Sequence, residues 1–198
     1  MIDPACAGAV AALEHDPFYR CISAELGADL ARRRAALAQY FDYSICQGAR
    51  IGQVVRPADA AQGVAVWTLP QTSAMHERER GLKEAFLRVA IGERGYRDYE
   101  QIVSYMSQRA ATVVGSDCWY LSIVAIAPEA QGRGLGARLL APTLAQADAA
   151  GVTSYLETFS HQTLRFYGRM GFVACAEFDE PTTQAPYTVM VRRPGRER

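Results

Sequence analysis

Residues 131–136 read Gln-Gly-Arg-Gly-Leu-Gly, and this glycine-rich turn decides the fold. The turn follows the apolar run of residues 120–126 and precedes a second apolar run at residues 137–140. Glycine has no side chain and tolerates a positive φ, so a ligand can approach the backbone closely. Successive N–H groups in such a turn, continued by a helix N-terminus, attract anions. The stretch therefore predicts a pyrophosphate site between a strand and a helix.

Two common phosphate-binding loops do not fit these residues. A P-loop requires Gly-Lys-Ser or Gly-Lys-Thr, and the sequence contains neither. A dinucleotide-binding fingerprint requires G-x-G-x-x-G, but Gly132, Gly134 and Gly136 give G-x-G-x-G. The glycine-rich turn therefore belongs to another class of site.

The hexad does match the pattern Q/R-x-x-G-x-G/A, and it resembles the pyrophosphate loop of the GNAT superfamily of N-acetyltransferases. Residues 120–128 resemble the central strand of that family and its exit, and residues 155–158 resemble the next strand. Residues 164–172 resemble the closing helix, with its Phe-Tyr and Gly-Phe pairs. The stretches Ala65-Val66-Trp67-Thr68-Leu69-Pro70 and Leu156-Glu157-Thr158 look closest to the puromycin N-acetyltransferase branch.

The resemblance implies an α/β (α+β) fold in a single domain spanning residues 1–198. Its sheet would be mixed, twisted and mostly antiparallel, with helices on its faces and a splayed parallel pair at 119–126 and 154–158. Residues 117–192 would bind acetyl-CoA, and residues 17–116 would bind the acceptor. Chains of this family usually begin with a strand. Residues 1–15 lack a strand pattern here, and residues 9–13 favour a short helical turn instead.

Local patterns place the remaining elements. Asp16 and Pro17 indicate a helix start, with Asp16 as the N-cap. Periodicity and turn residues predict helices at 17–26, 28–43 and 134–150, a pair of helices within 72–113, and strands at 49–55, 62–69, 172–178 and 187–192. Pro142 lies inside the helix at 134–150, where a bend is expected.

Composition excludes several classes of function. Lys plus Arg equals Asp plus Glu at 21 each, so no charge bias indicates a nucleic-acid or membrane partner. No apolar run reaches the ~20 residues of a membrane span, and residues 1–4 do not begin a signal peptide. The five cysteines form no C-x-x-C pair and the three histidines are far apart, so no metal site is expected. We expect a cytoplasmic protein whose thiols are reduced and mostly buried. The run of arginines at 32–34 is read as a solvated helix face.

The resemblance assigns acetyl-CoA as co-substrate and distributes its contacts over two segments and one helix position. The backbone of three strand residues would bind the pantetheine arm: Val124, Ala125 and Ile126. The turn would bind the pyrophosphate through Gln131, Gly132, Arg133, Gly134, Leu135, Gly136 and Ala137. Thr163 stands where the family often has Asn, and it would contact the pantetheine region with a hydroxyl in place of an amide. Arg138 is either a further phosphate ligand or solvated surface.

Two residues are the candidates for catalysis. Tyr167 occupies the family's usual acid position and would protonate the leaving thiolate, or stabilise it by hydrogen bonding. Glu157, near the end of its strand, would act as base or orient the substrate ammonium, and burial would have to raise its pKa. A packing role for Tyr167 and a structural ion pair or helix cap for Glu157 stay open as alternatives. His161 is expected to be exposed.

These assignments predict an N-acetyltransferase that acts on the primary amine of a small molecule. A regulatory module that binds acyl-CoA without turnover and an acetyltransferase of protein amines are the alternatives, and a homodimer stays open. The acceptor would be selected by residues outside the motifs, so the sequence does not name it.

Overall fold

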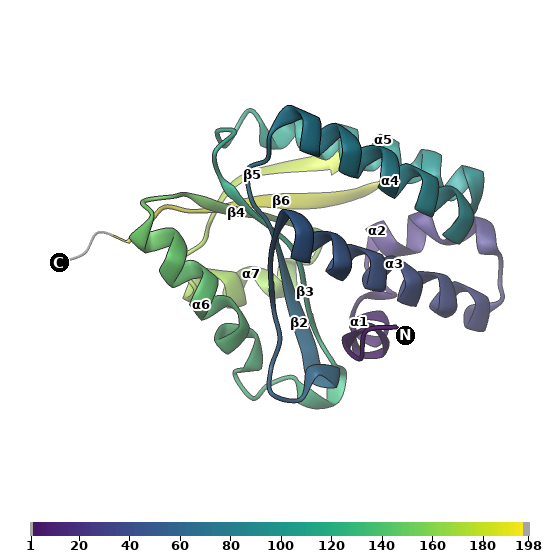
Figure 1. The fold of residues 1–198 in the computed structure, drawn as a ribbon, viewed down its shortest axis with the longest axis horizontal. Coiled ribbons are helices and arrows are strands. Elements are labelled where there is room, and N and C mark those ends of the chain that lie inside the picture. Colours follow the sequence, from purple (N-terminus) through teal and green to yellow (C-terminus); the bar gives the residue numbers. More distant parts are fainter. Residues whose placement is uncertain (1, 196–198) are drawn as a thin grey trace.

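The computed structural model describes residues 2–195. A six-stranded sheet has the order β1-β2-β3-β4-β6-β5, and helices cover both of its faces (Figure 1). All neighbouring strands are antiparallel except β3 and β4, which are parallel. This is the mixed, mostly antiparallel fold that the resemblance predicts. The strands are β1 (Gly52–Val55), β2 (Gly63–Thr68), β3 (Trp119–Ile126), β4 (Ser154–Thr158), β5 (Val173–Glu180) and β6 (Ala185–Arg192). The α-helices are α1 (Ala5–Leu13), α2 (Pro17–Ile22), α3 (Leu30–Ile51), α4 (Ser73–Ala90), α5 (Gly92–Ala110), α6 (Leu135–Ala149) and α7 (His161–Arg169).

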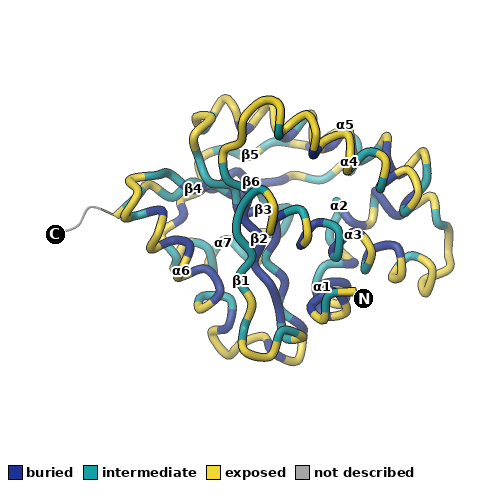
Figure 2. The backbone as a smooth tube through the Cα atoms, viewed as in Figure 1, coloured by how far each residue is buried: buried dark blue, intermediate teal, exposed yellow. Residues whose placement is uncertain are grey.

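The two faces of the sheet carry separate hydrophobic cores. Helices α1 to α5 pack over one face, where Phe41, Ile45 and Val189 are fully or almost fully buried. Helices α6 and α7 lie on the other face, and their core includes Leu140 and Leu156. The central strands are mostly buried, and the outer surfaces of the helices are exposed (Figure 2).

The N-terminus begins with a helix where the family usually has a strand. Helix α1 buries Cys6 and Ala9, and contacts the ends of β2 and β3. Asp16 then caps α2, and its carboxylate accepts a hydrogen bond from the Phe18 N–H at 2.9 Å. The expectation of a helical turn without a first strand is confirmed, as is the cap.

Helix α3 extends further than periodicity predicts. The expected helix ended near Tyr43 and the expected strand began at Ala49, but α3 continues to Ile51 and β1 begins at Gly52. The added part of α3 includes Gly48, which packs against β2. A Cβ at this position would lie 2.4 Å from Val66 Cγ1, so the glycine lets α3 pack directly on β2. A second boundary also differs from the prediction. Helix α2 ends at Ile22, before the expected end at about Leu26.

Two other expectations are wrong in detail. Arg33 and Arg34 do not form a purely solvated face, since Arg33 donates to Ser23 Oγ at 3.2 Å and Arg34 pairs with the buried Glu14 at 2.7 Å. The thiols are free but not mostly buried. Cys6 is buried, whereas Cys46 and Cys175 are exposed.

Helices α4 and α5 form a pair in the segment of chain that connects β2 to β3. The sequence predicts a break between them near Gly92 or Gly95, and the break occurs at Gly92, which has a φ of 80°. Arg50 of α3 ties α4 to α3 through a two-pronged ion pair with the buried Glu79, at 2.8 and 3.0 Å. The β5–β6 hairpin forms as predicted, and α6 continues through Pro142 without a break.

Candidate active site

The parallel strands β3 and β4 separate after a short contact. Only two register pairs join them, Trp119 with Ser154 and Tyr120 with Tyr155. Beyond these pairs β3 stays with β2 as far as Ile126, while β4 stays with β6 as far as Thr158. The facing backbone edges of β3 and β4 therefore lose their partner strand, and a wedge opens between them. This is the splayed pair that the sequence predicts.

A β-bulge in β3 sets which groups face the wedge. The register passes from Trp67–Leu121 to Val66–Ile123, so Ser122 is an extra residue. Its Oγ donates to Val66 O at 3.0 Å. Leu121 belongs to the core under α6, whereas Ile123 belongs to the core under α1 to α5. The bulge thus reverses the alternation of side chains within β3.

Past the bulge, backbone direction follows from two contacts with the β2 side. Ala127 N–H donates to Gln62 O at 3.0 Å. The Ala125 carbonyl points to Gly63, where an added Cβ would lie 2.6 Å from that oxygen. Because backbone groups alternate along a strand, Val124 and Ile126 direct theirs into the wedge. The sequence predicts backbone contacts to a pantetheine arm from three residues of β3. The backbone groups of Val124 and Ile126 face the wedge, whereas those of Ala125 face β2.

The glycine-rich turn begins where β3 ends. Gly132 and Gly134 adopt φ values of 75° and 72°, which favour glycine. Gln131 fixes the turn to the strand, since its Nε2 donates to Ile126 O at 3.0 Å. An added Cβ at Gly134 would have only Arg138 Nη1 within 4 Å, at 3.6 Å. The outer side of the turn is therefore open.

Helix α6 follows the turn directly and presents the free N–H groups of its first turn. The Arg138 N–H donates to Gly134 O at 3.2 Å, which is the first hydrogen bond of the helix. The N–H groups of Leu135, Gly136 and Ala137 come before it and have no acceptor within the helix. The buried side chain of Leu135 anchors this end. Arg133 and Arg138 are both exposed, and Arg138 Nη1 donates to Arg133 O at 3.0 Å.

Helix α7 packs against the start of α6 at Gly136. A Cβ there would lie 2.9 Å from Phe166 Cζ, so the glycine permits close packing. The next residue, Tyr167, packs edge-on against Phe166 and Phe172, with ring centroids 5.0 and 6.0 Å away. Burial raises the pKa of Tyr167 to about 12, and the negative charge of Asp16 adds to the rise. Tyr167 is thus a neutral hydrogen-bond donor at physiological pH.

Thr163 lies one turn earlier on α7, and its hydroxyl already has local partners. It donates to Ser160 O at 2.8 Å, and its oxygen lies 3.0 Å from Thr158 Oγ1. These contacts fasten the start of α7 to the end of β4. A further ligand would therefore meet a hydroxyl that is already used in the fold.

Glu157 lies on the opposite face of the sheet from α6 and α7. Its neighbour Leu156 belongs to the core under α6, while its register partner Val189 belongs to the core under α1 to α5. The Oε1 atom of Glu157 is buried and has no hydrogen-bond partner. Burial raises its pKa to about 7, although a hydrogen bond from Tyr120 opposes the rise. The carboxylate therefore titrates near neutral pH.

Comparison with known proteins identifies the family. The model of the acetyltransferase (GNAT) family matches residues 67–172, just over half of the chain. The chain belongs to the GNAT family of acetyltransferases. A solved structure described as histone acetyltransferase HPA2 and related acetyltransferase, from Corynebacterium glutamicum, is 25% identical with a TM-score of 0.63. That match covers 98% of this chain and 91% of the other.

Two further solved structures share the fold at lower identity. An agmatine N-acetyltransferase is 16% identical over 90% of this chain and 87% of its own, with a TM-score of 0.58. A polyamine N-acetyltransferase from Drosophila melanogaster is 17% identical over 80% of this chain and 81% of its own, with a TM-score of 0.54. These likenesses concern the fold. The GNAT assignment makes this protein an acetyltransferase, and enzymes of the family use acetyl-CoA.

Several polar residues of this GNAT enzyme lie near Glu157 and Tyr167. The sequence patterns did not identify these neighbours as site residues. Tyr120 and Tyr155 stack beside Glu157 with ring centroids 4.7 Å apart. Asp16 is the more informative case. Burial raises its pKa to about 6, against the hydrogen bond from Phe18 N–H. The Asp-Pro pair revealed only the helix cap, because no local pattern shows that a cap will be buried near Tyr167.

Other polar groups lie away from this centre. His161 is exposed, as expected, and its Nε2 lies 3.9 Å from Glu177 Oε1. Within residues 2–195, no three His, Cys, Asp or Glu side chains gather in a way that could hold a metal ion. No helix in that same part of the chain is long and apolar enough to cross a membrane.

Proposed function

We propose that this enzyme transfers the acetyl group of acetyl-CoA to the primary amine of a small molecule. The observation that carries the proposal is the wedge between β3 and β4. It joins the glycine-rich turn at one end to Tyr167 and Glu157, which approach the sheet from opposite faces. Two substrates could therefore meet at the wedge from two sides.

The residues at the wedge fit acetyl-CoA. The open space outside Gly134 leaves room for a pyrophosphate against the free N–H groups that begin α6. The Val124 backbone and the Ile126 N–H offer hydrogen bonds to a pantetheine arm, as an added strand would, while the Ile126 carbonyl already accepts from Gln131 Nε2. Ala125 would contribute through packing. Gln131 would act by holding the turn, and Arg133 and Arg138 are placed to neutralise phosphate charge from the surface.

The reaction would be direct attack of the neutral amine on the thioester carbonyl. The new C–N bond forms, the C–S bond breaks, and the amine loses one proton while the thiolate gains one. Glu157 would accept the amine proton, directly or through water, because a base with a pKa of about 7 works well near neutral pH. Tyr167 would donate a hydrogen bond or proton to the thiolate. A backbone N–H in the wedge would polarise the carbonyl.

The acceptor class and the cellular location are inferred from features other than the wedge residues. The puromycin N-acetyltransferase branch makes the amine of an aminonucleoside one of the first acceptors to test. The free thiols and the use of acetyl-CoA fit a reducing, cytoplasmic location. A regulatory module without turnover would have no need of a base beside the thioester.

Two measurements test the proposal. Calorimetric titration with acetyl-CoA should give one saturable site, and thiol release should depend on an added amine. Failure of both would refute the acetyltransferase site assigned here. Binding without thiol release across amines of different classes would favour the regulatory module, and acetylation of peptides alone would favour a protein acceptor.

A further inference from the structure

Glu157 shares one face of the sheet with a stacked pair of tyrosines. Tyr120 and Tyr155 form the last register pair of β3 and β4 before the two strands separate. Their side chains lie on the face of α1 to α5, because the neighbouring Leu121 and Leu156 belong to the core under α6. Glu157 follows Tyr155 by two residues, so it lies on the same face just past the point of separation.

The stack holds the Tyr120 ring in a defined place. The ring centroids of Tyr120 and Tyr155 are 4.7 Å apart, with an angle of 25° between the ring planes. Stacking of offset aromatic rings is favourable, and both rings here are attached to paired strand positions. The Tyr120 hydroxyl donates a hydrogen bond to the Glu157 carboxylate. The sheet itself therefore fixes this hydroxyl relative to the carboxylate.

The other titratable groups beside Glu157 are also tyrosines. The charge of Glu157 raises the pKa of Tyr155 and that of Tyr187 on β6. The Tyr187 hydroxyl is buried without a hydrogen-bond partner. Among the residues that the structure describes, Tyr120 alone donates to the carboxylate. One hydroxyl of the three therefore supports the charge of Glu157.

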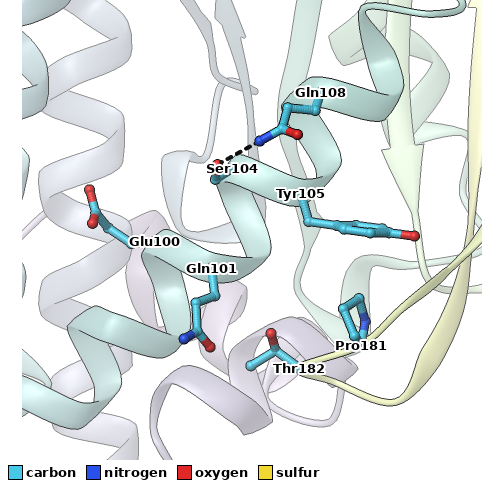
Figure 3. Close-up of a pocket in the computed structure, with 7 residues that line it drawn as sticks. All are labelled: Glu100, Gln101, Ser104, Tyr105, Gln108, Pro181 and Thr182. Carbon is cyan, nitrogen blue, oxygen red and sulfur yellow. Dashed lines mark hydrogen bonds between the residues drawn. The ribbon is translucent and has the colours of Figure 1, made fainter.

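Further groups act on these tyrosines from the neighbouring helices and from β5: Tyr19, Tyr105, Arg109 and Glu180. Tyr105, for example, extends from α5 toward the β5–β6 hairpin (Figure 3). Within the described part of the chain, no Lys, Arg or His contributes to the pKa of Glu157. Burial raises this pKa and the hydrogen bond from Tyr120 alone lowers it, so the ionised form of Glu157 depends on that hydroxyl.

A hydrogen bond to an ionised carboxylate stabilises the charged form and restricts its orientation. We propose that Tyr120 is a positioning residue for the reaction, because its hydroxyl holds Glu157 in one orientation and keeps it ionised to accept a proton from the amine. This rests on the proposed function, in which Glu157 is the base. The proton moves from the amine nitrogen to the carboxylate. Tyr120 keeps its own proton throughout, because burial and the charge of Glu157 raise its pKa.

Loss of the hydroxyl removes this support with little change of shape. In Tyr120→Phe the ring can still stack on Tyr155, but the carboxylate loses its donor. A hydrogen bond to a charged group changes an equilibrium by about tenfold or more. The Glu157 carboxylate of the variant should therefore bind its proton about tenfold more tightly than that of wild type.

Carboxyl-carbon NMR of the isotope-labelled free enzyme measures this directly, with the Glu157 signal identified by its absence from Glu157→Gln. Tyr155→Phe is the matched control, because it removes from the same stack a hydroxyl that does not bond Glu157. The titration midpoint should move to higher pH in Tyr120→Phe and stay at about 7 in wild type and the control. Equal midpoints in all three proteins, or an equal change in both variants, would overturn the proposal.

Rates separate a positioning role from a merely structural one. With puromycin as acceptor, the ratio of wild-type kcat/KM to that of Tyr120→Phe cancels the titration of the amine itself. The ratio should be about tenfold at pH 6 and fall to within about twofold at pH 9, where Glu157 is mostly ionised in both proteins. The ratio for Tyr155→Phe should not vary with pH. A deficit of Tyr120→Phe that is the same at every pH would contradict the positioning role.

The two measurements also distinguish this proposal from the proposed function. The NMR midpoints are obtained without any substrate, so they decide on the Tyr120 hydroxyl whatever the enzyme acetylates. A wild-type enzyme that binds no acetyl-CoA would instead refute the proposed function. A midpoint that moves in Tyr120→Phe while the rate ratio stays constant with pH would overturn the link between Tyr120 and the reaction.

Discussion

Replacing Glu157 by Gln should both stabilise the protein at alkaline pH and slow the reaction. The substitution keeps the shape of the side chain but removes its charge. In the folded protein, burial raises the pKa of Glu157 from the ordinary 4.5 to about 7. At about 1.4 kcal/mol for each tenfold change in proton affinity, this rise corresponds to about 3 kcal/mol. Ionising Glu157 at pH 8 therefore destabilises the folded state by up to about that amount.

The direction of the pH dependence follows from the raised pKa. The contribution of protonated Glu157 to stability is fully present below pH 4.5 and is lost as the pH rises through about 7. Wild type and Glu157→Gln should therefore have similar stability at pH 4.5. At pH 8 the variant should be more stable by up to about 3 kcal/mol, which is several degrees in melting temperature for a domain of this size.

The assay is urea unfolding from pH 4.5 to 8, with Glu177→Gln as the control. Glu177 is exposed on β5, so the stability of Glu177→Gln should depend on pH in the same way as that of wild type. Rate measurements complete the test. Wild-type kcat/KM should rise with pH through about 7, and Glu157→Gln should lack that rise, so the two differ most above pH 7. A variant that is less stable than wild type at pH 8 and retains its rate would refute the reasoning.

Three further predictions concern the other parts of the site and the fold. Gly134→Val should weaken acetyl-CoA binding in calorimetry without unfolding the protein, because it strains a left-handed residue by ~1–2 kcal/mol and fills the space for phosphate; unchanged affinity would exclude the turn. Tyr167→Phe should lower kcat by ~10²–10⁴-fold and leave acetyl-CoA affinity unchanged; near-wild-type turnover would exclude an essential acid. Arg50→Ala should destabilise the protein by about 3 kcal/mol in urea unfolding, because it leaves the buried Glu79 unpaired while Arg50 itself is partly exposed; Arg50→Ala combined with Glu79→Leu should recover part of the loss, and no recovery would refute a charge-based cause.

The segment from β3 to α7 could be predicted because its signals are local. The turn at residues 131–136 needs glycines at positive φ, and the sequence shows them directly. Strands β3 and β4 have the bounds that the family resemblance implies. The pattern of Gly-Phe after α7 likewise reports a local chain reversal at Gly171, where φ is 87°.

The contacts and boundaries of the other elements could not be predicted because they depend on tertiary structure. The boundary between α3 and β1 depends on how Gly48 packs against Val66, which no periodicity reports. The ion pair of Arg34 with Glu14 joins residues that are 20 positions apart. Helix α5 lies beside the β5–β6 turn, more than 70 positions later in the chain. Sequence patterns describe each element but not which elements meet.

The bulge at Ser122 connects these two parts of the fold physically. Without the bulge, in a strand that alternated regularly through Ser122, Val124 and Ile126 would share a face with Tyr120, and their N–H groups would point to β2. With it, the start of β3 places Tyr120 beside Glu157, and its end turns the backbone of Val124 and Ile126 toward the wedge. The bulge thus lets a single strand place Tyr120 on the face of α1 to α5 and direct the backbone of Val124 and Ile126 to its free edge. For the proposed reaction, the separation of β3 from β4 and the bulge act together, because the separation frees the edge of β3 and the bulge turns these backbone groups toward it.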